Sequence, residues 1–206
     1  SAGVGCYGFK MEKFNCVATN ELLQRRLDVQ RANNKCKYES GYIQGDILLE
    51  ETKQKILSQV ELWKTKEKMD ELTVLIATPP CQGMSVANHK KGDENKRNSL
   101  VVASLELIKQ IKPKFFVLEN VKAFLTTICT DLDGKDKKIK EAINTNLGDL
   151  YDIEFKVLNF KNYGANSSRT RTLVIGARKD LDIAPETLYP VYRKEKTLRE
   201  IIGDLP

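Results

Sequence analysis

The sequence is poor in several residue types on which common protein chemistries depend. Its 206 residues include one tryptophan and one histidine, His89. A catalytic dyad built on histidine would therefore have to use His89, which stands in a polar stretch where we expect a surface or substrate-facing role. No apolar stretch is long enough to span a bilayer, and no secretory signal pattern is present. The sequence therefore predicts no membrane-spanning helix.

Cysteine is present but not in a pattern that builds structure. The five cysteines are odd in number and form no C-x-x-C pair: Cys6, Cys16, Cys36, Cys81 and Cys129. This argues against a disulfide framework and against a zinc knuckle, so no metal is predicted. A reducing cytoplasm suits free thiols and would keep any one of them able to react.

Composition and charge are those of a soluble globular chain that could meet nucleic acid. The apolar fraction is 41%, the net charge is +6 and the isoelectric point is about 9.0. The length fits one domain with a sizeable core. The positive charge is spread along the chain, so it is compatible with nucleic-acid binding without proving it.

Apolar runs that resemble strands alternate with helical patterns along the chain. Strands are expected at 14–19, 72–77, 115–119, 153–160 and 172–177, and helices at 21–32, 52–63, 99–111 and 137–147. Such alternation predicts an α/β fold with a doubly wound, mostly parallel sheet. The last two strands have no helix between them, so an antiparallel strand is expected near the end.

The most informative segment is Thr78-Pro79-Pro80-Cys81-Gln82-Gly83, which follows the apolar run 72–77. Proline ends the strand, because it lacks an N–H and has a fixed φ. Cys81 would then stand on a stiff turn at the carboxyl end of a strand, where open α/β sheets bind their ligands. A thiol there is a candidate nucleophile, although a single cysteine is more often a buried small hydrophobe.

Three further segments help to decide whether Cys81 is a nucleophile or a buried structural residue. The strand 115–119 ends in Glu119-Asn120-Val121, the loop 163–169 leads into Arg169-Thr170-Arg171, and the chain starts with a G-x-G-x-x-G turn, Gly3 to Gly8. Each segment alone has an ordinary interpretation: a carboxylate that caps a helix, a solvated basic loop or a common glycine turn.

Together and in this order, these blocks resemble those of the cytosine-C5 DNA methyltransferases. The resemblance rests on Pro-Pro-Cys-Gln-Gly-x-Ser, Glu-Asn-Val and Arg-x-Arg, and it extends from Gly3 to Leu205. It implies a Rossmann-like methyltransferase fold. It also implies that Cys81 adds to C6 of cytosine, that Glu119 holds the N3 and amino edge, and that Asn120 orients the loop behind Cys81. The resemblance assigns Arg171 and Arg169 to the O2 edge and to Glu119.

The resemblance further implies that S-adenosylmethionine is the cofactor. The residues expected to bind it are Gly3, Gly5, Glu21, Leu22, Asp46, Ile47, Pro80 and Leu100. Glu21 would bind the ribose hydroxyls and Asp46 the adenine amino group, while Leu22 and Ile47 would cover the ring. Helix capping is the alternative for both acids. A nicotinamide cofactor would suit the same glycine turn, but hydride transfer needs no nucleophilic thiol.

The substrate implied is a cytosine flipped out of double-stranded DNA. The residues expected to contact DNA are Gln82, Ser85, Lys90, Lys91 and Arg97, in a loop, 83–98, that would close over it as a lid. The chain departs from the family at Asn166-Ser167, where members commonly carry Pro-Gln. That departure affects the role of Arg169 more than that of Arg171.

Residues 1–206 are expected to form a catalytic domain that is incomplete at both ends, without a target-recognition region. A second chain could supply that region. We expect a bacterial, cytoplasmic enzyme of a restriction–modification system, whose DNA target sequence the chain does not specify. Two alternatives stay open: a methyltransferase of the RNA-modifying branch, and a non-catalytic nucleic-acid-binding subunit on the same fold.

Overall fold

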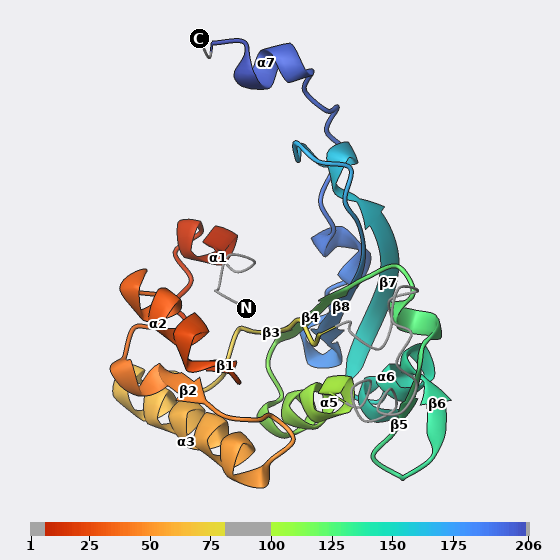
Figure 1. The fold of residues 1–206 in the computed structure, drawn as a ribbon. Helices are drawn as coiled ribbons and strands as arrows, with labels where there is room; N and C mark the ends of the chain where they lie inside the picture. The colour runs from red at the N-terminus through yellow and green to blue at the C-terminus, as the bar shows by residue number, and fades with distance from the viewer. Residues whose placement is uncertain (1–6, 81–99, 205–206) are drawn as a thin grey trace. The chain divides into compact units, whose positions relative to one another are not determined.

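The computed structural model describes residues 7–80 and 100–204. The chain divides into two compact units, one up to Leu72 and one from Thr73 onwards. Each unit is described by itself (Figure 1). In the part of the chain that is described, no helix is both long and apolar enough to cross a membrane.

The first unit is a parallel pair of short strands with helices around it. Its elements are α1 (Tyr7–Met11), β1 (Thr19–Glu21), α2 (Gln24–Ala32), the 3₁₀ helix η2 (Glu39–Gly41), β2 (Tyr42–Gln44) and α3 (Glu50–Glu67). Glu21 is paired with Gln44, so both strands end at the same edge. The long helix α3 buries Ile56, Val60 and Trp63, which are spaced to share one helical face.

The start of this unit corrects one prediction. A strand was expected at 14–19, but β1 begins only at Thr19. The left-handed backbone at Lys13 (φ 63°) ends α1, and the ring of Phe14 packs edge-to-face on Phe9 at 5.3 Å. Phe14 therefore closes the helix that precedes it. The helix predicted from residue 21 begins at Gln24, and β2 was not predicted.

The second unit is built on a four-stranded sheet in the order β3-β4-β8-β7. Its elements are β3 (Val74–Ala77), α5 (Leu100–Ile111), β4 (Phe115–Asn120), η3 (Phe124–Thr126), β5 (Ile128–Thr130), β6 (Asp136–Lys138), α6 (Ile139–Leu147), β7 (Tyr151–Asn159), η4 (Phe160–Asn162), β8 (Thr170–Arg178), η5 (Lys179–Leu181), η6 (Pro185–Leu188) and α7 (Leu198–Ile202). β3 and β4 are parallel, and β8 is antiparallel to both β4 and β7. Only β8 runs against the other three, which confirms the expected antiparallel strand near the end.

Helices cover one face of this sheet. α5 and α6, side by side in Figure 1, bury Val101, Leu105, Ile108, Ile139, Ile143 and Leu147 against alternate residues of β4 and β8. The other face holds a smaller cluster of Leu158, Ile175 and Tyr189, the last of which follows η6. The polar hairpin β5–β6, which sequence periodicity did not predict, lies beside α6.

One glycine is required by the packing of the sheet. Gly176 on β8 is directly paired with Phe116 on β4. A Cβ at position 176 would lie 2.0 Å from the Phe116 ring, which is closer than any side chain tolerates. The ring of Phe116 in turn packs edge-to-face on Tyr151, with centroids 5.0 Å apart. This arrangement fixes the register of the strands that carry the polar residues described next.

Candidate active site

Polar residues gather where β4 ends and β8 begins. Glu119 and Asn120 are the last two residues of β4, and Arg171 and Thr172 lie near the start of the antiparallel strand β8. Asn120 is paired with Thr172, and Glu119 with Leu173. Since directly paired residues share a face of the sheet, Asn120 and Thr172 lie on one face, and Glu119 and Arg171 on the other.

An ion pair joins the two strands on the face of Glu119. Nε of Arg171 lies 3.1 Å from Oε1 of Glu119, and Nη2 of Arg169 lies 4.0 Å from the same oxygen. Nη1 of Arg171 also donates to the carbonyl of Thr170 at 2.7 Å, which restrains its guanidinium. The side chains of Glu119 and Arg171 are 28% and 19% exposed, against 54% for Arg169. Arg171 is therefore the principal partner of the carboxylate.

Asn120 links the end of β4 to the end of β3. Its amide nitrogen donates to the carbonyl of Pro79 at 2.9 Å, and its amide oxygen accepts from the backbone N–H of Val121 at 2.8 Å. Asn120 is buried, so both bonds are shielded from water. In the sequence, Pro79 and Pro80 directly precede Cys81, so Asn120 is bonded to the backbone two residues before this cysteine.

The acids expected to hold a cofactor lie in the first unit. Glu21 is the last residue of β1, and Asp46 follows the end of β2, so both stand at the carboxyl edge of the parallel pair. Glu21 is buried, and its Oε1 accepts from Arg26 at 3.3 Å and from the backbone N–H of Leu22 at 3.1 Å. Asp46 accepts from the N–H of Leu48 at 3.0 Å, which forms a local turn.

The alternative interpretation of these acids as helix caps is not realised. The N-cap positions of α2 and α3 are occupied by Leu23 and Leu49, and neither helix has a side-chain cap. Beside Asp46, Gly45 is needed because a Cβ there would lie 2.4 Å from the hydroxyl of Thr52. Leu22 is 59% exposed, and Ile47 is half-buried.

Other predicted site residues are only partly placed. Pro80 is exposed after β3, and Leu100 opens α5; both belong to the second unit. Eight predicted residues lie outside the described ranges: Gly3, Gly5, Cys81, Gln82, Ser85, Lys90, Lys91 and Arg97. The predicted lid, 83–98, lies outside them as well. Within the described residues, no group of three or more His, Cys, Asp or Glu could hold a metal ion.

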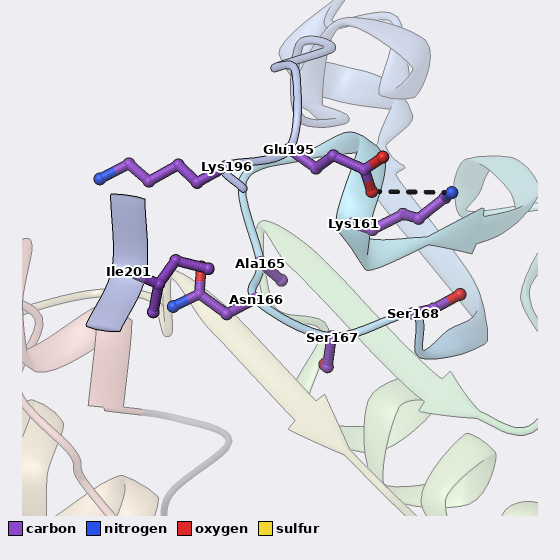
Figure 2. A pocket seen from close by; sticks show the side chains of 8 residues that line it. All are labelled: Lys161, Ala165, Asn166, Ser167, Ser168, Glu195, Lys196 and Ile201. Atoms are coloured by element: carbon purple, nitrogen blue, oxygen red, sulfur yellow. Dashed lines mark ion pairs between the residues drawn. The ribbon is translucent and has the colours of Figure 1, made fainter. Parts of the chain in front are cut away.

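A hollow lies beside the loop 163–169, which leads into Arg169 (Figure 2). Its volume is about 210 Å³, and it is lined by Lys161, Ala165, Asn166, Ser167, Ser168, Glu195, Lys196 and Ile201. Lys161 and Glu195 face each other at 3.6 Å. None of the residues predicted to act lines it, but Asn166 and Ser167, where the chain departs from the family pattern, both do. The departure therefore shapes the surface next to Arg169 and leaves the Glu119–Arg171 pair intact.

Sequence reasoning missed one residue of this region. Thr172 is fully buried, and its hydroxyl donates to the carbonyl of Val121 at 3.0 Å. In the sequence it is a threonine within an otherwise apolar strand, and strands commonly contain threonine. Only the register of β4 against β8 shows that it lies opposite Asn120.

Comparison with known proteins assigns the chain to a family. The family model of C-5 cytosine-specific DNA methylases matches residues 1–206. The chain belongs to this family. It is 30% identical to the Type II methyltransferase M1.HgaI of Avibacterium volantium, over 100% of this chain and 55% of that protein. It is 34% identical to the Type II methyltransferase M.MthTI of Methanothermobacter thermautotrophicus, over 70% of this chain and 42% of that protein.

Solved structures bear out the fold. The S. pombe Dnmt2 methyltransferase superposes with a TM-score of 0.59 at 13% identity, over 98% of this chain and 52% of that one. At this identity the likeness concerns the fold, which is the Rossmann-like methyltransferase fold that the sequence predicted. The chain spans about half the length of the curated relatives that it matches.

Proposed function

We propose that the protein transfers a methyl group from S-adenosylmethionine to C5 of a cytosine in DNA, as part of a restriction–modification system. The observation that carries this proposal is the arrangement at the ends of β3, β4 and β8. There Glu119 is paired with Arg171, and Asn120 holds the carbonyl of Pro79, two residues before Cys81. Family membership and the two Type II relatives supply the reaction class.

The chemistry assigns one task to each residue. C5 of cytosine is a weak nucleophile, so electron density has to be pushed onto it. The thiolate of Cys81 forms a bond to C6, and the displaced electron pair moves toward C5, which then takes the methyl group. Glu119 holds the N3 and amino edge of the base and stabilises the proton on N3 as charge develops. After transfer, a base removes the C5 proton, and the bond from C6 to sulfur breaks.

The two arginines and the asparagine position these groups. Arg171, restrained by Glu119 and by the carbonyl of Thr170, would bind the O2 edge of the base. Arg169, at 4.0 Å and more exposed, would assist it. Asn120 fixes the backbone in front of Cys81. Because none of the reacting atoms is reachable inside a duplex, the cytosine has to be flipped out, which costs a few kcal/mol.

The residues of the first unit fit the cofactor that methyl transfer needs. When bound, S-adenosylmethionine supplies an electrophilic methyl group. Glu21 and Asp46 stand at one edge of the β1–β2 pair, where an acid can accept from ribose hydroxyls or from the adenine amino group. The exposed side chain of Leu22 and the half-buried Ile47 are suited to cover the ring. Gly3, Gly5, Pro80 and Leu100 complete the proposed set.

Contacts to DNA are assigned to the segment that follows Cys81. Gln82, Ser85, Lys90, Lys91 and Arg97 would contact the substrate. Phosphate contacts by lysine and arginine bind without reading sequence, so these residues would position the duplex. The target sequence would be read by a recognition region, either in the same polypeptide or in a second chain.

Trapping of a covalent intermediate tests the proposal. The full-length protein is incubated with S-adenosylmethionine and a DNA duplex in which 5-fluorocytosine replaces cytosine. Fluorine at C5 cannot leave as a proton does, so a protein–DNA adduct should accumulate, and Cys81→Ser should abolish it. An adduct that survives Cys81→Ser would contradict the mechanism. Trapping on 5-fluorocytosine RNA but not on DNA would instead favour the RNA-modifying branch.

A further inference from the structure

The buried hydroxyl of Thr172 stands at the start of a series of hydrogen bonds. It donates to the carbonyl of Val121 at 3.0 Å, and a longer approach of 3.4 Å leads to the carbonyl of Lys122. A hydroxyl has one proton to donate, so the shorter contact is the main bond. Thr172 thus fastens the chain just beyond β4 to the neighbouring strand β8.

The same peptide segment is held from its other side by Asn120. The N–H of Val121 donates to the amide oxygen of Asn120 at 2.8 Å, and the amide nitrogen of Asn120 donates to the carbonyl of Pro79 at 2.9 Å. Rotating this amide by half a turn would lose both bonds. A shift of Val121 would therefore displace the Asn120 amide and, through its bond to the Pro79 carbonyl, the backbone after β3.

We propose that Thr172 is a positioning residue for the methyl transfer, because its hydroxyl fixes the carbonyl of Val121, and the N–H of the same residue holds the Asn120 amide in the orientation that reaches the Pro79 carbonyl. The inference rests on the proposed function, since that function gives Asn120 and the Pro79 backbone their importance. Thr172 lies on the face of the sheet opposite to Glu119 and Arg171, so it acts through Asn120 and not on the base.

Replacement of the hydroxyl at constant shape tests this role. Thr172→Val keeps the side-chain volume and removes the donor, and Thr172→Ser keeps the donor. In the full-length protein we expect kcat to fall about tenfold to hundredfold in Thr172→Val, as small displacements of catalytic groups produce. KM for DNA should stay close to that of the parent, and Thr172→Ser should recover most of kcat.

Tyr151→Phe is the matched control. The buried hydroxyl of Tyr151 donates to the carbonyl of Pro113 at 2.8 Å, at the opposite end of the same sheet. Its removal deletes the same kind of bond, so it should lower Tm as Thr172→Val does but leave kcat unchanged. If Thr172→Val also lowers only Tm, the hydroxyl is merely structural and the inference is wrong.

A double-mutant cycle separates this inference from the proposed function. If Thr172 acts through Asn120, Thr172→Val should add little further loss of kcat in the Asn120→Ala background. Full additivity would overturn the inference. Should Thr172→Val be obtained only in aggregates, Thr172→Ala is measured in its place, and a parental kcat in that variant overturns it too. If the unmutated protein neither methylates DNA nor forms the adduct, the proposed function itself is wrong.

A second and independent observation concerns two cysteines of the first unit. Cys16 and Cys36 form an isolated parallel bridge between their backbones, and their sulfur atoms lie 3.6 Å apart. Neighbouring strands are spaced about 4.8 Å apart, which is within the range of Cα separations that a disulfide spans. The two residues are 20 positions apart, so no sequence motif revealed the pair.

We infer that Cys16 and Cys36 are a redox pair that hydrogen peroxide converts into a disulfide, which thiols can reduce again. The sulfur of Cys16 attacks one peroxide oxygen, the O–O bond breaks, and Cys16 becomes a sulfenic acid as water leaves. The sulfur of Cys36 then displaces the hydroxyl from Cys16 as a second water. Two thiols lose two electrons, and one peroxide becomes two waters.

The surroundings of the pair support this order of attack. Cys16 is the more accessible thiol, and Cys36 is buried. The hydrogen bond from Cys36, helped by the charge of Lys35, lowers the pKa of Cys16 to about 7, although burial opposes this. The lowered pKa makes Cys16 the thiol of the pair that loses its proton more readily, and thiolate is the reactive form. The bond to Cys16 and burial raise the pKa of Cys36.

Peptide mapping after mild oxidation tests the pair. The full-length protein, in a Cys81→Ser background that removes the proposed catalytic thiol, is treated with hydrogen peroxide, alkylated and digested without reduction. We expect a cross-linked peptide joining Cys16 to Cys36 that dithiothreitol abolishes. Cys129 is the internal control, because burial raises its pKa to about 11 and it should stay reduced. Sulfinic acid at Cys16 without a cross-link, or a cross-link to another cysteine, would overturn the inference.

Discussion

The two ends of the four-stranded sheet each carry an arginine–carboxylate pair, and the pairs differ in construction. At one end, Arg178 holds Asp180 through two contacts of 2.7 and 2.9 Å, and its partner is only two residues away. At the other end, Arg171 reaches Glu119 on a different strand, and the shortest contact between them is 3.1 Å. The shortest approaches of Arg171 and Arg169 to Glu119 both end at Oε1.

This difference separates a pair that stabilises a turn from a pair suited to bind a substrate. Arg178 also donates to the carbonyl of Lys112 at 2.7 Å, so its guanidinium ties two loops together. Glu119 stands between two strand ends, with a second, more exposed arginine at 4.0 Å. Arg171 thus orients the carboxylate of Glu119, and 28% of the Glu119 side chain stays exposed, so that a ligand can reach it. We therefore expect catalysis to depend on the Glu119 end of the sheet and not on the Asp180 end.

The two ends of the sheet should differ most in the rate of methyl transfer when the carboxylate of Glu119 or of Asp180 is neutralised. Glu119→Gln should slow methyl transfer about 10²–10³-fold, the usual cost of losing one preorganised electrostatic contact. Asp180→Asn should leave the rate unchanged and lower Tm slightly. Single-turnover transfer of a tritiated methyl group to DNA, at saturating protein, measures both variants. Equal losses in the two variants would mean that the ends of the sheet do not differ in function.

The residues of this comparison show what could be predicted from sequence. Glu119, Asn120, Arg169 and Arg171 were predicted from their blocks, because a strand end followed by polar residues is a local pattern. That Arg171 pairs with Glu119 came from the family resemblance, and the geometry now places the two side chains in contact. The role of Thr172 could not be predicted, since it depends on a backbone carbonyl and on strand register.

The fold was predictable to a similar extent. Long elements with clear periodicity were found, such as α3, α5 and β8. Elements of three residues, such as β2 and β6, leave no periodicity to detect. The error at 14–19 arose because Phe14 satisfies an apolar pattern locally while packing on Phe9. The Cys16–Cys36 pair depends on two bridged backbones and is invisible to any spacing rule.

Replacing Arg171 or Arg178 with lysine should give a smaller difference in kcat between the two ends of the sheet. Lysine keeps the charge but has no planar fork, so it cannot hold Glu119 and the Thr170 carbonyl together. Arg171→Lys should lower kcat about tenfold with a smaller change in KM, as expected for a group that orients others. Arg178→Lys should change Tm and not kcat. Steady-state kinetics and thermal denaturation of the same samples measure kcat and Tm of both variants. A fall in kcat of Arg178→Lys as large as that of Arg171→Lys would contradict the expected difference between the two ends of the sheet.

The smallest effect is expected in the pH dependence of stability. The hydrogen bonds from Arg178 lower the pKa of Asp180 below its usual value. Its contribution to stability is therefore fully present above the pKa of the unfolded chain, about 3.9, and is lost as pH falls through the lower folded pKa. Thermal denaturation between about pH 2 and pH 6 should show a steeper acid decline for the parent than for Asp180→Asn. Parallel curves for the two proteins would contradict this interpretation.

The contact between Phe116 and Gly176 has a consequence for how the family can vary. The phenyl ring fills the space in which residue 176 would carry its side chain, since a Cβ there would lie 2.0 Å from the ring. The two positions therefore share one side-chain volume across neighbouring strands. Among homologous sequences they should change together: glycine at 176 should accompany an aromatic residue at 116, and a larger residue at 176 should occur only where 116 is small.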